Sequence, residues 1–83
     1  MTMDGVIHLH DIVALLEDTP ASHFETARAL VLRRGQIGTV VMTYDGSAVE
    51  VEFAGCDGKP YAILPVLVAK LMRLHDTPEY AAA

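Results

Sequence analysis

Residues 33–41 read Arg-Arg-Gly-Gln-Ile-Gly-Thr-Val-Val, and this stretch decides the fold class. Two glycines three positions apart predict a tight turn, because Gly35 and Gly38 can adopt backbone angles that a Cβ penalises. The residues at 39–41 suit a pleated, half-buried surface, so the turn leads directly into a strand. The stretch therefore predicts where a β-sheet begins. It contains no nucleophile, no acid–base pair and no cluster of metal ligands.

The segments on either side of this turn also predict strands. Residues 11–16 form a nearly continuous apolar run, which is typical of a strand covered on both faces or at the centre of a small barrel. We expect it to end at residues 17–20, because Pro20 cannot donate to a ladder. After the turn, residues 39–44 form the second strand, and Asp45-Gly46 is the strongest hairpin signal in the chain.

Residues 48–54 alternate cleanly between apolar and acidic side chains. The alternation predicts a half-exposed antiparallel strand with Glu50 and Glu52 toward solvent. The side chains expected to point inward are Val49, Val51 and Phe53.

A second Asp-Gly turn, at residues 57–58, predicts a further hairpin that leads to a strand at 61–64. Pro65 is expected to break the pairing of that strand. Residues 66–70 are compatible with one 3₁₀-like turn, and residues 71–75 with a closing strand.

The segment at residues 21–32 is the least regular part of the chain. Ser22 and Glu25 match a capping box, which favours a short helical turn over residues 23–29. Because so short a helix is marginal in water, it would have to dock through Phe24 and Leu30. The alternative is an irregular surface loop.

Together these signals predict one mainly β domain, a small five-stranded SH3-like barrel with a short helical turn in its first long loop. Closing the sheet would remove the vulnerable edges of so short a β-protein. The predicted boundaries are a flexible N-terminus at residues 1–9, the barrel at 10–75 and a loose C-terminal tail at 76–83.

Composition limits the classes of partner. The net charge is −5, and no basic cluster is longer than Arg33-Arg34, so a general nucleic-acid-binding role is unfavourable. A hydrophobic fraction of 52% is high for 83 residues and indicates a protein partner or a homodimer. The single cysteine, Cys56, and the lack of a secretory leader predict a cytoplasmic protein. No apolar run is long enough for a membrane helix.

Several stretches, taken together, resemble one family of small bacterial proteins, DUF4926. They are residues 11–20, 32–41, 49–53, 57–62 and 71–75, and the resemblance covers most of residues 10–75. It implies an SH3-like barrel, as in KOW modules and the β-chain barrel of nitrile hydratases. It implies no reaction, because the function of the family is unassigned. Residues 21–31 look like an insertion relative to that family.

Other candidate sites have ordinary structural interpretations. His8 and His10 would share one side of a strand and could bind a metal together with a carboxylate such as that of Asp11, but a solvated strand edge is the preferred explanation. Cys56 has only Lys59 as a basic neighbour, so an inert thiol is expected. We predict no cofactor and no metal.

Two further groups of side chains are candidates for binding a partner and not for catalysis. Glu50, Glu52 and Asp57 could form an acidic patch for a basic partner. The barrel aromatics Tyr44, Tyr61 and Phe53 could hold an extended peptide, although core packing with a hydroxyl at the rim is the preferred explanation.

The sequence therefore predicts a non-enzymatic protein-binding module with an acidic face, of the kind an antitoxin or immunity protein uses against a basic toxin. Two alternatives stay open. One is a KOW-like nucleic-acid-binding module using Arg28, Arg33 and Arg34, and the other is an accessory subunit of a larger enzyme. The residues predicted to bind the partner are Phe24, Arg28, Arg33, Arg34, Tyr44, Glu50, Glu52 and Tyr61.

Overall fold

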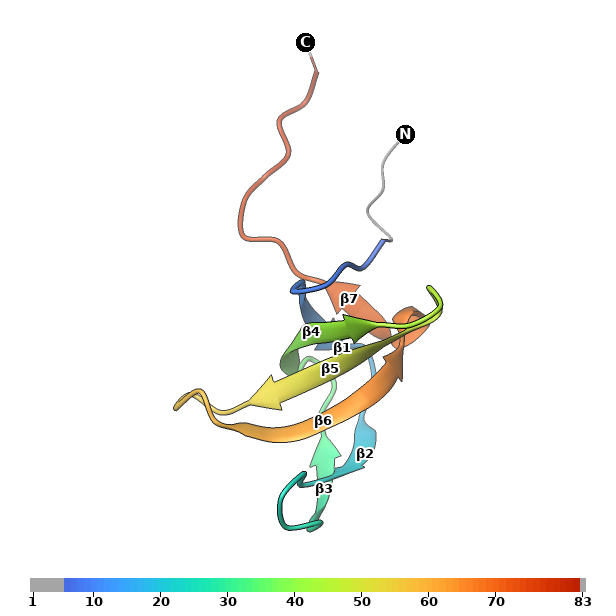
Figure 1. The fold of residues 1–83 in the computed structure, drawn as a ribbon. Coiled ribbons are helices and arrows are strands. Elements are labelled where there is room, and N and C mark those ends of the chain that lie inside the picture. Colours follow the sequence, from blue (N-terminus) through green and yellow to red (C-terminus); the bar gives the residue numbers. More distant parts are fainter. Residues whose placement is uncertain (1–5, 83) are drawn as a thin grey trace.

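The computed structural model describes residues 6–82, and the fold is mainly β, as predicted (Figure 1). The elements in chain order are β1 (Ile12–Leu15), β2 (Thr19–Ser22), β3 (Ala29–Leu32), β4 (Ile37–Thr43), β5 (Ala48–Ala54), β6 (Pro60–Leu67), a 3₁₀ turn η1 (Val68–Lys70) and β7 (Leu71–Arg73). Among the described residues no helix has the length and apolar character to cross a bilayer. The predicted frayed start at residues 1–5 lies outside the described residues.

Five strands form one antiparallel sheet with the order β6-β5-β4-β1-β7. β6 and β7 lie at its two edges, and no ladder joins them within residues 6–82. The sheet is strongly curved but is not closed into a barrel, which corrects the predicted closure (Figure 1). Two edges therefore remain where the prediction had none.

The helix predicted over residues 23–29 does not form, and only a single turn remains at residues 24–26, closed by a hydrogen bond from the Ala27 N–H to the carbonyl of His23 at 2.8 Å. β2 and β3 pair instead as a separate two-stranded antiparallel sheet, with Thr19 opposite Leu32 and Ser22 opposite Ala29. The hairpin extends away from the larger sheet on the side opposite the C-terminal tail (Figure 1). Ser22 is therefore a strand residue and not a helix cap, because pairing with a neighbouring strand outweighs the modest helix propensity of this segment.

The core forms between the concave side of the sheet and the β2–β3 hairpin. Val49, Val51 and Phe53 of β5 are buried as predicted, and their neighbours Glu50 and Glu52 lie on the other face, half exposed. The other buried apolar residues in the core are Val13, Leu15, Leu32, Val40, Ala62, Val66 and Leu71.

The two glycines of the deciding stretch have different roles. Gly35 has a φ of 87°, in the left-handed region that favours glycine, as the turn predicted. Gly38 is needed for another reason, because a Cβ there would lie 2.6 Å from Cγ1 of Val51 and 2.9 Å from Cε1 of Phe53. The core thus fixes Gly38 by close packing and not by its backbone angle.

β6 is longer than predicted and continues through Pro65, which lies opposite Glu50. The prediction that Pro65 breaks the pairing is wrong. β6 is an edge strand, so on its outer side no backbone N–H takes part in the ladder. A proline at such a position therefore costs no ladder bond. The predicted 3₁₀ turn is present at η1, and the closing strand is β7, shorter than expected.

Candidate protein-binding face

The convex face of the five-stranded sheet carries apolar side chains around two glutamates. Strand register places Ile12, Thr39, Glu52 and Ile63 in one row across β1, β4, β5 and β6. A second row runs Met42, Glu50, Pro65. These positions alternate with the buried residues of the same strands, so their side chains leave the sheet on the side away from the core. We call these seven residues the acidic face.

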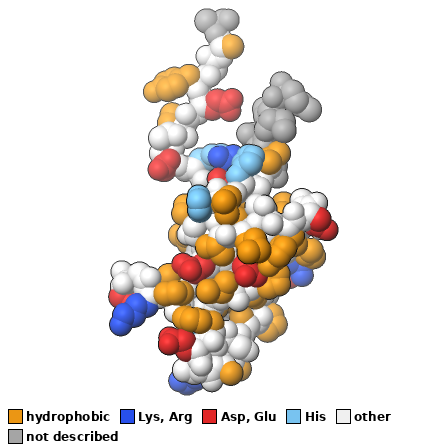
Figure 2. All heavy atoms as spheres, in the orientation of Figure 1, with side chains coloured by type: hydrophobic (Ala, Val, Ile, Leu, Met, Phe, Trp, Pro, Cys, Tyr) orange, Lys and Arg blue, Asp and Glu red, His pale blue; other side chains and the backbone are white. Residues whose placement is uncertain are grey.

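The apolar members of this face are well exposed: Ile12 by 44%, Met42 by 50% and Ile63 by 38%. Figure 2 shows the result as hydrophobic side chains that gather around a few acidic ones over β4, β5 and β6. Single exposed apolar residues are ordinary on protein surfaces, but several on one uncovered sheet face are typical of an interaction site.

Glu50 is held in place by a hydrogen bond, and neither Glu50 nor Glu52 is neutralised. The Tyr44 hydroxyl donates a hydrogen bond of 2.7 Å to Oε1 of Glu50, and this bond with the nearby negative charge raises the pKa of Tyr44. Neither Glu50 nor Glu52 forms an ion pair with any residue in the described part of the chain. The face therefore presents two uncompensated carboxylates among apolar side chains.

Other predicted contact residues lie at the tip of the β2–β3 hairpin. Phe24 is exposed there and stacks on His23 with 5.5 Å between ring centroids. Its backbone N–H donates to the carbonyl of Tyr61 at 3.1 Å, which ties the tip to β6. The Tyr61 hydroxyl accepts a hydrogen bond from the Gln36 side chain, so Tyr61 is half buried rather than part of an aromatic groove.

The structure does not bring the three predicted arginines together. Arg28 precedes β3, whereas Arg33 and Arg34 follow it, and the five residue steps from Arg28 to Arg33 span about 16 Å of extended chain. Asp18 accepts hydrogen bonds from Nε of Arg33 at 3.3 Å and from the backbone N–H of Arg34 at 2.8 Å. The convergence of these three arginines that the nucleic-acid alternative assumed is therefore not formed.

The histidine run does not lie in a strand, which corrects its expected geometry. Residues 9 and 10 form a turn in which His10 has a φ of 73°. Asp11 accepts a hydrogen bond from the backbone N–H of His8 and pairs with Nε of Arg73 at 3.3 Å. Within residues 6–82 no three His, Cys, Asp or Glu side chains gather closely enough to hold a metal ion.

The remaining candidates are spread over the molecule. Phe53 belongs to the core, with no exposed surface. Cys56 and Asp57 lie in the exposed turn between β5 and β6, where Asp57 accepts a hydrogen bond from the backbone N–H of Lys59. Asp57 thus caps its own turn and does not extend the acidic face.

Sequence reasoning singled out Glu50 and Glu52 of the acidic face, and Tyr44 beside Glu50, but missed the apolar members of that face. Ile12, Met42 and Ile63 occur in runs where apolar residues occupy both faces of the strand, so alternation does not reveal which of them point outward. β5 alone alternates cleanly. The high apolar content of the chain indicated that some apolar side chains would be exposed, but it did not indicate which ones.

The comparisons with known proteins give a family but no function. No curated protein and no solved structure matches the chain. One family model matches residues 9–73, which is most of the chain and includes every strand described above. The protein thus belongs to the family described as "Domain of unknown function (DUF4926)".

Proposed function

We propose that the protein is a non-enzymatic binding module that recognises a basic partner protein through the acidic face. The observation that carries the proposal is the pair of carboxylates, Glu50 and Glu52, which lie on an exposed apolar sheet face and form no ion pair with any of residues 6–82. A partner that covers this face would have to supply the compensating charge.

The spacing of the two carboxylates specifies the partner further. Residues two apart on a strand lie about 7 Å from each other. Two Lys or Arg side chains at i and i+2 of an extended segment, or at i and i+4 of a helix, match this spacing. Apolar side chains beside them would cover Ile12, Met42 and Ile63. Charge complementarity of this kind speeds association and excludes partners of the wrong sign.

The size and charge of the chain support a more specific role. A small acidic protein with net charge −5 suits neutralisation of a basic toxin, as an antitoxin or immunity protein does. The curved antiparallel sheet with long central hairpins also supports an SH3-like arrangement that has opened at one side. A free exposed thiol at Cys56 fits a reducing compartment such as the cytoplasm.

The test is affinity capture from the native host with tagged protein, comparing wild type with Glu50→Lys/Glu52→Lys. The matched control is Glu25→Lys/Glu79→Lys, which makes the same charge change at the hairpin tip and in the tail. We expect wild type and control to retain one basic protein in stoichiometric amount and the Glu50/Glu52 variant to lose it. Equal capture by all three proteins would show that the acidic face is not the binding site.

A further inference from the structure

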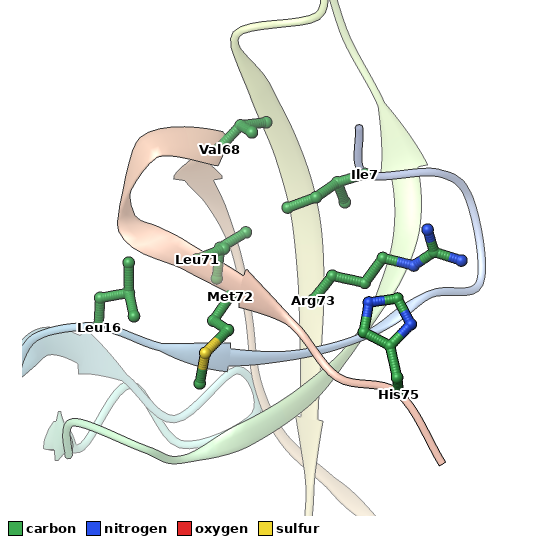
Figure 3. A pocket seen from close by; sticks show the side chains of 7 residues that line it. All are labelled: Ile7, Leu16, Val68, Leu71, Met72, Arg73 and His75. Carbon is green, nitrogen blue, oxygen red and sulfur yellow. The ribbon is translucent and has the colours of Figure 1, made fainter. Parts of the chain in front are cut away.

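The two open edges of the sheet differ in length and in the charge beside them. β7 spans three residues, and the groove of about 410 Å³ beside it is bordered mainly by apolar side chains (Figure 3). The one charged residue of β7, Arg73, already pairs with Asp11 at 3.3 Å. β6 spans eight residues and lies next to β5, which carries Glu50 and Glu52. The β6 edge therefore has both the length and the neighbouring charge to select a partner.

The backbone groups of β6 that point away from β5 can be identified from one hydrogen bond. The N–H of Val68, directly after β6, donates to the carbonyl of Ser47, directly before β5, at 2.9 Å. Because backbone groups alternate between the two sides of a strand, the groups of Leu67, Pro65 and Ile63 point to the outer side. Among residues 6–82 no backbone hydrogen bond reaches these outer groups.

The β2–β3 hairpin occupies the beginning of this edge. The N–H of Phe24 donates to the carbonyl of Tyr61 at 3.1 Å, so the outer side of β6 already accepts a backbone donor from another segment. The free part of the edge extends from Ile63 to Leu67. It offers the N–H and carbonyl groups of both residues and the carbonyl of Pro65, which are the groups that an added strand pairs with.

We infer that an extended basic segment of the partner protein adds to this edge as a further strand. The inference rests on the proposed function, from which it takes the charge of the partner. Strand register places Ile63 in one row with Glu52, and Pro65 in one row with Glu50. Partner residues opposite Ile63 and Pro65 are two positions apart, so their side chains point to the same face. Lys or Arg side chains there would extend over β6 to the two carboxylates, which lie two strand spacings away, or about 10 Å.

An extended segment fits these features better than a second copy or a helix does. β6 carries no charged residue, so the β6 strand of a second copy would supply no cation to the carboxylates. A helix laid over the acidic face could supply cations but would not use the outward backbone groups. The missing N–H at Pro65 also makes the edge selective, because a strand that pairs here forms fewer backbone bonds and depends more on its charges.

The test uses the capped peptide Thr-Val-Lys-Thr-Lys-Val-Thr as the probe and Thr-Val-Lys-Lys-Thr-Val-Thr as a control of identical composition. Both lysines of the probe point to one face of an extended strand, whereas those of the control point to opposite faces. In an NMR titration the probe should move the amide protons of Ile63 and Leu67 downfield, because they gain hydrogen bonds. The amide protons of Leu64 and Val66, which face β5, should change little. We expect the control to bind about threefold to fivefold more weakly, since only one of its lysines can reach the carboxylates.

Two pairs of variants separate the backbone contribution from the charge. Ile63→Pro removes an outward N–H without removing a bond to β5, and Ile63→Ala is its control, which shortens the side chain but keeps the N–H. We expect Ile63→Pro to bind the probe about threefold to tenfold more weakly than Ile63→Ala does. Glu50→Lys/Glu52→Lys should lose the probe, whereas Glu25→Lys/Glu79→Lys should retain it. Circular dichroism verifies folding, and if Ile63→Pro does not fold, the amide shifts of wild type still decide.

Three outcomes would overturn the inference. The first is equal binding of probe and control, or no binding of either. The second is binding that leaves the Ile63 and Leu67 amides unchanged, in which case a basic partner lies across the acidic face and the proposed function stands. The third is a downfield shift of these two amides with rising protein concentration alone, which would assign the edge to a second copy. Host-protein capture that is insensitive to Glu50→Lys/Glu52→Lys would instead remove the proposed function and the inference together.

Discussion

The hydroxyl of Tyr44, one residue beyond β4, donates a 2.7 Å hydrogen bond to Oε1 of Glu50 on β5. The bond joins the two strands across the outside of their hairpin and orients one of the two carboxylates of the acidic face. Since Tyr44 is exposed, the bond contributes more to the position of Glu50 than to stability.

We predict that Glu50→Gln lowers the pKa of Tyr44 toward its ordinary value. The carboxylate raises this pKa because an ionised phenolate would lose its hydrogen bond and face a negative charge. NMR titration of the Tyr44 ring resonances measures the change, with Glu52→Gln as the control on the same strand. A Tyr44 titration that is identical in wild type and Glu50→Gln would show that the bond is not formed in solution.

Gly38→Ala should destabilise the fold by about 1–3 kcal/mol through overpacking. The added methyl group would overlap Val51 and Phe53 in the core, and the carbonyl of Glu52 at 3.0 Å leaves it no room to shift. Urea unfolding followed by circular dichroism gives the change in the free energy of unfolding. Gly55→Ala is the comparison, because Gly55 does not have a positive φ and a Cβ there would meet only the side-chain oxygen Oδ1 of Asp57, at 3.1 Å, in an exposed turn. Equal stability of Gly38→Ala and wild type would contradict the packing described at this position.

Asp18→Asn should lower the melting temperature at neutral pH but not in acid. The hydrogen bond from the Arg34 backbone, with a further contribution from Arg33, holds the pKa of Asp18 below its ordinary value. A carboxyl whose pKa is depressed by folding stabilises the protein above its unfolded pKa, and this stabilisation is lost as pH falls through the folded pKa.

Melting curves at pH 7 and below about pH 3 test this dependence. We expect a difference between wild type and Asp18→Asn at pH 7 that shrinks in acid. Glu79→Gln, in the tail, controls for the loss of one negative charge. A difference that persists unchanged at both pH values would rule out ionisation of Asp18 as its cause.

The β2–β3 hairpin should open more readily than the five-stranded sheet. A two-stranded sheet is marginal on its own, and this one is anchored through few contacts, including the bond between Phe24 and Tyr61. Amide hydrogen exchange should therefore be faster in β3 than in β5.

His23→Ala should increase exchange in the hairpin further. Its Nδ1 accepts hydrogen bonds from the N–H groups of Glu25 at 3.1 Å and Thr26 at 3.4 Å, which fix the turn. His75→Ala, a substitution of an exposed histidine after β7, is the control. Equal protection of β3 and β5 in wild type would mean that the two sheets unfold as one unit.

Much of the central sheet could be predicted because its signals are local. The alternation of Val49, Val51 and Phe53 places β5 and its inner face without knowledge of any neighbour. Asp45-Gly46 and Asp57-Gly58 mark the two hairpins that join β4, β5 and β6, and both glycines have the positive φ that such turns use.

The hairpin at residues 19–32 could not be predicted in the same way. Ala27 and Arg28 favour helix, and the match of Ser22 with Glu25 imitates a helix start. These preferences amount to a few tenths of a kcal/mol per residue. Pairing of β2 with β3 and burial of Leu32 outweigh them, and both depend on contacts that the local sequence does not contain.

The sequence by itself determined the β class, the inner face of β5, the turns and two of the three polar members of the acidic face. Tertiary structure decided which face Ile12, Met42 and Ile63 occupy and which strands became edges. The physical reason is that a strand's outward residues are defined by what its neighbours cover. An apolar run looks the same in sequence whether one face or both faces of its strand are covered, so only the assembled sheet distinguishes the core from the exposed face.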